Sequence, residues 1–537
     1  MFIATIPNRN SPPAILLRQG YRAEGKVKTR TLANLTHWRA ERIEALRRAL
    51  KGDFDGLVGE GDPMSGPVFG VLFALKCLAD ALGITQALGR KAIAKQALFL
   101  VIARIAHGGS RLSAVRWAAQ QAVEDVLGVS GFDEEDLYRA LDWLAAQQAR
   151  IEKRLYQHYL KRSGQPPVLV LYDVTSSYLE GTQNELAAYG YNRDGKRGKQ
   201  QIVIGLMTAP DGEPLAVRVF EGNTADPSTV SDQITLLKTQ FGIEEVVLVG
   251  DRGMIKSKAK AALAHTEGFK YITALTNPQI RVLLKKDVLQ MELFDTGLCE
   301  LEHAGKRLIL YRNEAIQARE QARREDKLAC LAEKIDQRND FVGQSKRANP
   351  QAGLRQLQHW LKRHKLSAFV DLTLNERRIE YCPDEAGMRQ ATLLDGCYVL
   401  ETDVHPQHMN TKTIDARYRD LQKVERNFRT LKTDFLEVRP IFLRKANRTQ
   451  AHVFVAMLAL KITRLFEQKI HPTFGTTDQD PKALTLEDAL TALSRITYLH
   501  YQVNDQTFAR LPRLDETQTA IFDALGISFP KSTAKAA

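Results

Sequence analysis

The sequence has little cysteine and no long hydrophobic run. Its 537 residues include five scattered cysteines and no CxxC pair, which argues against a disulfide framework and against a zinc site built from paired cysteines. The longest apolar stretches, near VFGVLFAL and VFVAMLAL, fall short of the roughly 20 residues that span a bilayer. The start, MFIATIPNRNSPP, lacks the charged and apolar regions of a signal peptide. We therefore expect a soluble, cytoplasmic protein.

Acidic residues are the minority among the charged ones. There are 63 Asp and Glu against 76 Lys and Arg, which gives a net charge of +13 and a pI near 9.3. The excess is uneven, because residues 1–50 hold ten basic and three acidic residues and residues 411–448 hold eleven and five. Cationic surfaces neutralise phosphates and bind them in a salt-dependent way, so the composition favours a nucleic-acid partner. A charge run alone is usually a solvated face.

Three polar residues recur at steps of seven in ARYRDLQKVERNFRTLKTDF (residues 416–435), namely Tyr418, Glu425 and Lys432. Seven residues are nearly two helical turns, so the three side chains share one face of a predicted helix. Apolar residues at steps of three and four mark the buried stripe of that helix: Leu421, Val424, Phe428, Leu431 and Phe435. The polar row lies beside this stripe, which places Glu425 at the rim of the buried face. An ordinary ion pair with a basic neighbour is the alternative role for Glu425.

Two aspartates are predicted at the ends of buried strands. The run PPVLVLYDVTSSYLEG (166–181) indicates a strand over residues 168–172 that ends at Asp173, and EEVVLVGDRGMIK (244–256) indicates a second strand followed by Asp251. Between them, IVIGLMTA and PLAVRVF form two more strands around a turn at residues 210–213. A helix follows, with Asp226 as its predicted N-cap before a proline. The expected order is strand, strand, strand, helix, strand.

This order, with Asp173, Asp251 and then a helical Glu425, resembles the RNase H-like catalytic core of DDE transposases from bacterial insertion sequences. The Y-x6-E-x6-K row resembles the Tyr-Arg-Glu-Lys signature of the insertion-sequence-four type, and GDRGM is similar to the element around that family's second aspartate. The arginine of the signature falls at Leu421, where this sequence departs from the pattern. Its role stays unassigned between Arg419 and Arg426.

The resemblance implies an α/β fold: an RNase H-like core with a mixed five-stranded sheet and helices, interrupted by a β-rich insertion and preceded by a β-hairpin and a helical domain. The implied activity is cut-and-paste DNA transposition in the bacterial cytoplasm, with cleavage at the element ends and strand transfer into target DNA. Two functions stay open beside it, a nuclease or junction resolvase on the same fold and a transposase-derived DNA-binding protein that no longer cuts. Three intact acids weigh against the last.

Three carboxylates suit phosphodiester chemistry. Two divalent ions about 4 Å apart can activate an attacking oxygen and stabilise the leaving one. Hard cations prefer carboxylate oxygens and water, so we expect two Mg²⁺ ions, with Mn²⁺ as a possible substitute. Asp173 is predicted to bridge both ions, with Asp251 on one and Glu425 on the other.

The resemblance also implies DNA contacts from Tyr418 and Lys432, whose plainer alternatives are an edge-of-core tyrosine and a solvated lysine. Basic residues predicted near the acids complete the candidate DNA-binding set: Arg419, Arg426, Arg429, Arg252, Arg193 and Lys199. The expected partners are double-stranded DNA, both terminal inverted repeats and target, and a second copy of the chain in the synaptic complex. His452, in a later apolar helix, is predicted to be packed rather than catalytic.

Six segments are expected along the chain. They are a basic hairpin region (1–55), a helical region with end recognition or plain scaffolding as its role (56–164), the first part of the core (165–276), a β-rich insertion (277–410), the second part of the core with the Glu425 helix (411–466) and a C-terminal helical region with a tail (467–537). The insertion accounts for the long gap between Asp251 and Glu425, which as a structureless loop would argue against the assignment.

Overall fold

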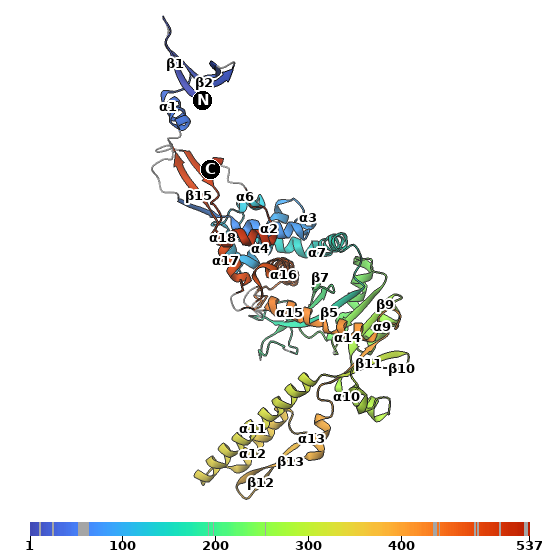
Figure 1. Cartoon of the computed structure of the whole chain (residues 1–537). Helices are drawn as coiled ribbons and strands as arrows, with labels where there is room; N and C mark the ends of the chain where they lie inside the picture. The colour runs from blue at the N-terminus through green and yellow to red at the C-terminus, as the bar shows by residue number, and fades with distance from the viewer. Residues whose placement is uncertain are drawn as a thin grey trace. The chain divides into compact units, whose positions relative to one another are not determined.

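The computed structural model describes two compact units of this chain (Figure 1). The described residues are 1–9, 12–23, 26–51, 64–191, 193–196, 198–252, 254–432, 436, 438–439, 441–476, 480, 483–503, 506–530 and 535–536. One unit combines residues 1–75, 116–126 and 468–537, and the other combines residues 76–115 and 127–467. The units cut across the six expected segments, because the C-terminal region folds together with residues near the N-terminus.

The first unit begins with a three-stranded antiparallel sheet, β1 (Phe2–Ile6), β2 (Ala14–Ala23) and β3 (Lys26–Asn34). Strands β2 and β3 form the expected hairpin, and residues 24–25 between them lie outside the described residues. Every residue of β3 is exposed, so this sheet buries little apolar surface. Helix α1 (Ala40–Lys51) follows it.

A second sheet of the first unit joins the two ends of the chain. Its order is β17 (Lys535–Ala536), β16 (Gln506–Arg510), β15 (Thr497–Val503) and β4 (Met64–Val68). Helices α6 (Val123–Leu127), α17 (Leu486–Ser494) and α18 (Glu516–Leu525) belong to the same unit. Helix α17 starts with a capping box between Thr485 and Asp488. A hydrophobic core of the first unit contains stacked and edge-on aromatic rings, Phe69 and Tyr498 among them.

Helices precede the sheet of the second unit. They are the end of α2 (Gly70–Ala81), α3 (Ile84–Leu88), α4 (Ala92–Ala106), the start of α5 (Arg111–Ala118) and α7 (Glu134–Ser163). In the part of the chain that the structure describes, no single helix is long and apolar enough to cross a membrane. Only α4 and α5 taken together reach that length and composition, and they are bent by 94°.

The sheet of the second unit has eight strands in the order β10-β11-β14-β9-β8-β5-β6-β7. The strands run over Leu169–Tyr178 (β5), Gln201–Thr208 (β6), Pro214–Glu221 (β7), Val246–Gly250 (β8), Phe269–Ala274 (β9), Cys299–His303 (β10), Lys306–Arg312 (β11) and Cys397–Thr402 (β14). The five strands expected for the core are β7-β6-β5-β8-β9, with β5, β8 and β9 mutually parallel. Three strands from residues 277–410 extend this sheet beyond β9.

Two local predictions are wrong. Asp173 lies in the middle of β5 and not at its end, because β6 continues to pair with β5 as far as Tyr178. Asp226 does not cap its helix, α8 (Asp226–Thr235); Ala225 takes the N-cap position, and the Asp226 carboxylate accepts a hydrogen bond from Arg193 instead. The helix continues through a π-helical turn at Leu236–Gln240 before β8.

The predicted 416–435 helix is two helices joined at Asp420. Tyr418 is in α14 (Thr411–Arg419), and Glu425 and Lys432 are in α15 (Leu421–Lys432). The predicted apolar stripe of α15 is buried at Leu421, Val424, Phe428 and Leu431, and Phe435 lies outside the described residues. Helix α16 (Ala446–Phe474) is almost wholly buried between residues 451 and 462, as its apolar sequence predicts.

The inserted segment is a mixed structure with two long helices. Besides β10, β11 and β14 it contains α10 (Asn277–Lys285), a 3-10 turn (Met291–Phe294), α11 (Glu314–Gln344), α12 (Pro350–His364), β12 (Val370–Asn375), β13 (Arg378–Pro383) and α13 (Glu385–Thr392). Helix α9 (Ser257–Ala264) lies before it, between β8 and β9. Residues 331–379 have a hydrophobic core of their own, distinct from the one under β11 and β14. In Figure 1 these helices and the β12–β13 hairpin form an arm.

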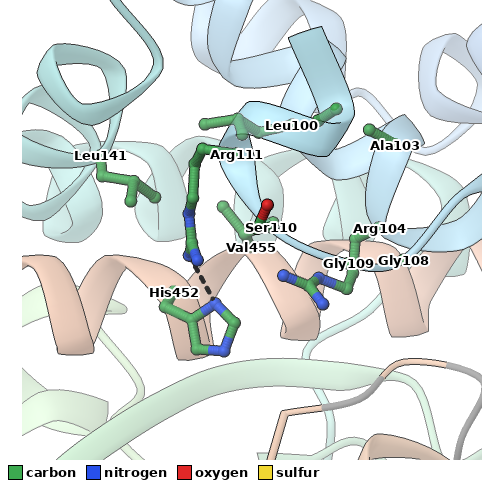
Figure 2. A pocket seen from close by; sticks show the side chains of 11 residues that line it. Leu100, Ala103, Arg104, Gly108, Gly109, Ser110, Arg111, Leu141, His452 and Val455 are labelled. Carbon is green, nitrogen blue, oxygen red and sulfur yellow. Dashed lines mark hydrogen bonds between the residues drawn. The ribbon is translucent and has the colours of Figure 1, made fainter. Parts of the chain in front are cut away.

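His452 of α16 is packed, as predicted. It is 5% exposed, its Nδ1 accepts from the Arg111 guanidinium at 3.0 Å, and Nε2 lies 3.4 Å from the carbonyl oxygen of Val438. Figure 2 shows this pair beside Arg104 at a cavity of about 20 Å³, room for about one water molecule. Burial and the two arginine charges hold the pKa of His452 well below its usual value, so the imidazole is neutral.

Candidate active site

Asp173 and Asp251 lie on neighbouring parallel strands. The last parallel register pair of β5 and β8 joins Tyr172 to Gly250, and each aspartate is the next residue along its strand. Helix α15 packs against β5 through its buried stripe and leaves Glu425 exposed. Gly250 sits close under Ile255, since a Cβ there would lie 3.1 Å from that side chain. Asp251 and Glu425 are near enough to Asp173 for their charges to act on its carboxyl group.

The pKa of the Asp173 carboxyl group is raised to about 7, mainly by burial and also by the negative charges of Asp251 and Glu425. The backbone N–H of Val174, 2.8 Å from Oδ1, and the charge of Arg193 act in the opposite direction. A cation in addition to Arg193 would relieve the repulsion between Asp173 and the other two acids.

Neither of the other two acids has a basic partner among the described residues. No ion pair or hydrogen bond to the Glu425 side chain occurs there, so the alternative of an ordinary ion pair on a solvated helix is not found. Asp251 accepts the Tyr418 hydroxyl at 3.1 Å and its neighbour's backbone N–H at 2.7 Å. Both carboxylates keep acceptor capacity.

The donor set suits a hard divalent cation. It offers three carboxylates, one buried and destabilised as an anion, and no thiolate or imidazole. The carboxylates do not close around one point: among described residues, no group of three or more His, Cys, Asp or Glu side chains lies close enough to hold an ion. The carboxylate side chains are ligands of the type that a hard divalent cation prefers, but they lie too far apart here to hold one ion together.

The predicted DNA-binding residues fall into three groups. Tyr418, Arg252 and Arg193 lie at the acids: Tyr418 bonds Asp251, the Arg252 side chain reaches Tyr418, and the charge of Arg193 acts on Asp173. Arg429 is exposed on α15.

Four others are held by nearby carboxylates. Lys432 pairs with Asp194 at 2.8 Å, Lys199 with Glu180 at 2.6 Å, Arg419 with Asp415 at 2.8 Å and Arg426 with Glu467 at 3.3 Å. Leu421, at the position of the signature arginine, is buried in the apolar stripe and supplies no polar group.

Sequence reasoning missed Asp194 and Arg439. Asp194 is the single acid in the basic run 190–200, and a lone carboxylate inside such a run is the feature that could have drawn attention to it. Arg439 donates to the same carboxylate at 2.6 Å. Arg439 adds a basic group near the end of α15, and Asp194 accepts hydrogen bonds from it and from Lys432.

Comparisons with known proteins agree with this architecture. The mixed sheet with helices packed on it defines an α/β protein of the RNase H-like class. The Transposase DDE domain family matches residues 164–462, and the N-terminal domain of the IS1634 family of transposases matches residues 3–58. Among solved structures, a piggyBac transposase in a synaptic complex with hairpin DNA aligns with 80% of this chain and 69% of its own, at 8% identity and a TM-score of 0.33. A comparison with curated proteins gives no match.

Because the first match covers more than half of the chain, the chain belongs to the Transposase DDE domain family. It is an insertion-sequence DNA transposase. It binds DNA, depends on divalent metal, cleaves at the ends of its element and transfers the strands to target DNA.

Proposed function

We propose that Asp173, Asp251 and Glu425 are the catalytic acids of this transposase and hold two Mg²⁺ ions. The observation that carries the proposal is the position of Asp173 and Asp251, each directly after the last register pair of the parallel strands β5 and β8, with Glu425 near enough for its charge to act on Asp173. Burial and then the charges of Asp251 and Glu425 raise the pKa of Asp173, against the Val174 N–H and the charge of Arg193. A divalent ion supplies the missing positive charge and, when bound, activates the attacking oxygen and stabilises the leaving one.

The chain's own residues orient these acids. The Val174 N–H fixes one oxygen of Asp173, and Tyr418 together with the Arg252 N–H fixes Oδ1 of Asp251. Glu425 approaches from α15, whose buried stripe sets the position of the helix on β5. To hold ions together with the two aspartates, Glu425 would have to approach them, since among the described residues no three such side chains lie close enough to hold one.

The DNA substrate is the terminal inverted repeats of the element and then a target duplex. Phosphate contacts come from the cations around the acids, with the exposed Arg252 and Arg429 placed to act first, while Arg193 is paired with Asp226. Because two ends have to be joined in one event, we propose that the synaptic complex contains two copies of the chain. Residues 1–55 and 56–164 are the proposed end-binding regions, and residues 277–410 are the proposed cover of the site.

The test is an assay with purified protein, Mg²⁺ and DNA that carries the repeats flanking the gene, in which cleavage and strand joining are followed separately. Asp173→Asn, Asp251→Asn and Glu425→Gln are each expected to abolish both reactions while DNA binding persists. Normal cleavage by any of the three variants overturns the assignment of that acid. Cleavage without joining, in the wild-type protein, makes the enzyme a nuclease or resolvase instead.

A further inference from the structure

Asp194 is a buried carboxylate in the basic run 190–200 of the loop between β5 and β6. Its side chain is 2% exposed. Oδ2 accepts the backbone N–H of Tyr178 at 3.1 Å, and the N–H of the preceding residue, Arg193, donates to the Ser176 hydroxyl at 2.9 Å. Both anchoring points are on β5, a few residues beyond Asp173. The loop is therefore pinned to the strand that carries the central acid.

The other oxygen of Asp194 accepts from two cations. Oδ1 lies 2.8 Å from the Lys432 ammonium and 2.6 Å from the Arg439 guanidinium. Arg439 also donates from Nε to the carbonyl oxygen of Lys432 at 3.0 Å, at the C-terminal end of α15. One carboxylate thus joins the catalytic strand, the end of the Glu425 helix and the segment that follows it.

The charges of this cluster do not cancel. Counted over the described residues, two cations and one carboxylate carry one net positive charge, in a place where two cations alone would repel each other. Lys432 is 12% exposed and Arg439 is 30% exposed, so the open side of the cluster is the guanidinium. Burial lowers the pKa of Lys432, and the hydrogen bond and charge of Asp194 act against that shift. The carboxylate keeps the ammonium charged and in place.

We propose that Asp194 assembles Lys432 and Arg439 into a binding site for one backbone phosphate of the DNA, with Arg439 as the direct contact. An arginine fork suits a phosphate, since two parallel N–H donors match two phosphate oxygens. The site lies seven residues from Glu425 along α15, about 10 Å at 1.5 Å per residue, so the phosphate belongs to the strand that enters the acids. The inference rests on the proposed function, because it presupposes DNA at those acids.

The alternative role for Asp194 is that of a competitor, a carboxylate that occupies the cations until DNA displaces it. The two roles predict opposite results for Asp194→Asn. If Asp194 organises Lys432 and Arg439, its loss leaves both cations without a fixed position and weakens DNA binding. If Asp194 competes with DNA, its loss frees both cations and tightens DNA binding.

The experiment measures the affinity of the full-length protein for a terminal-repeat duplex over a range of salt concentrations, without divalent metal. For Arg439→Gln we expect about tenfold weaker binding and a plot of log K against log salt that is shallower by about 0.9, the slope of one phosphate contact. For Arg439→Lys we expect the salt slope to persist. Arg513→Gln, which removes the same charge from an exposed side chain of the C-terminal region, outside the proposed end-binding and cover regions, is the matched control and should bind as the wild type does.

For Asp194→Asn, about tenfold weaker binding with a wild-type melting temperature supports the proposal, and tighter binding overturns it. If Asp194→Asn does not fold, the two Arg439 variants provide the test. An unchanged DNA affinity and an unchanged salt slope for Arg439→Gln overturn the proposal. An unrelated duplex of equal length separates repeat from generic DNA, and a drop on both duplexes identifies a contact shared by ends and target. The proposed function fails separately, when wild-type protein neither cleaves nor joins repeat DNA.

Discussion

The Tyr418 hydroxyl donates a hydrogen bond to Oδ1 of Asp251 over 3.1 Å. The tyrosine is the penultimate residue of α14, and the aspartate follows β8, so the bond connects the helix before α15 to the sheet. Burial and then the charge of Asp251 raise the pKa of Tyr418, which keeps the phenol a donor at every pH where the enzyme is tested. Tyr418, expected as a DNA contact, here acts on a second candidate acid.

Replacement of this donor is predicted to slow cleavage. In Tyr418→Phe, Asp251 loses a hydrogen bond of the kind that contributes about 1.5–3 kcal/mol when one partner is charged. We expect single-turnover cleavage to fall by about tenfold with little change in DNA affinity. The matched control is Tyr398→Phe, which removes a hydroxyl that donates to Asp415 at 2.5 Å and accepts from Arg419 at 3.3 Å, rather than one that donates to a candidate acid. A weaker DNA affinity with an unchanged cleavage rate would return Tyr418 to the role of a DNA contact.

Asp173 is predicted to make the metal-free protein less stable as the pH rises. Its pKa is about 7 in the fold against 3.8 for an unperturbed aspartate, so the folded protein binds the proton more tightly than the unfolded chain does. This contribution to stability is complete below about pH 3.8 and is lost progressively up to about pH 7. Asp173→Asn removes this pH-dependent loss of stability, because asparagine does not ionise.

Thermal unfolding of both proteins in chelator tests this expectation. Between pH 5.5 and pH 7 the melting temperature of Asp173→Asn should gain on that of the wild type by about 2 °C per pH unit, the equivalent of about 1 kcal/mol in a large domain. Above pH 7.5 the difference should be constant. A difference that shrinks with rising pH contradicts the burial of an ionisable Asp173.

Divalent metal is predicted to stabilise the wild-type protein through the same carboxylates. Binding to the folded state alone raises the melting temperature, and chelation should abolish cleavage while DNA binding continues through Lys and Arg contacts. Millimolar Mg²⁺ should raise the melting temperature of the wild type by about 2 °C and leave Asp173→Asn unchanged. An equal rise in both proteins would show that the ion binds elsewhere.

Lys461 is predicted to be a stabilising residue of the second unit. Its side chain is 3% exposed, its ammonium group is paired with Glu213, and it donates to the Pro214 carbonyl oxygen at 2.8 Å. Lys461→Met leaves a poorly compensated carboxylate and should cost about 3 kcal/mol in the free energy of unfolding. The same change at Lys199, whose pair with Glu180 is largely exposed, should cost less than about 1 kcal/mol. Denaturant titration of both variants measures the difference.

The pH dependence of this pair has the opposite sign to that of Asp173. Burial raises the pKa of Glu213, but the charges and hydrogen bonds of Lys461 and Arg162 outweigh it and hold the pKa below its usual value. Its stabilisation is therefore present above about pH 4.5 and is lost as the pH falls through the folded-state pKa. Lys461→Met should lose less stability than the wild type between pH 5 and pH 3.5; an equal loss would contradict this account.

Local patterns predicted the elements of the site well. The apolar stripe of α15 and the runs that became β5 and β8 depend on side-chain periodicity, which is a property of neighbours along the chain. The position of Asp251 just after β8 follows from them. The break at Asp420 left the row of seven on two helices without moving Glu425 from its place beside the sheet.

Non-local pairing accounts for what could not be predicted. The extension of β5 beyond Asp173 depends on β6, and the addition of β14, β11 and β10 to the sheet joins strands far from β9 in sequence. Nor could the sequence place Asp194 against Lys432 and Arg439, 238 and 245 residues away. Hydrogen-bond partners of single polar side chains are decided by the assembled fold, and periodicity carries no information on them.

The inserted arm begins and ends at one point of the sheet. Arg312, the last residue of β11, is paired with Cys397, the first residue of β14, and the next N–H, of Asn313, donates to the carbonyl oxygen of Gly396 at 2.8 Å. In terms of strand pairing, β11 and β14 are therefore a hairpin whose loop has grown into residues 313–396 with a hydrophobic core of its own. Such a loop could be enlarged, exchanged or deleted in evolution without a change in the strand order of the sheet that carries the acids. We therefore expect the arm to differ most between transposases of different insertion elements.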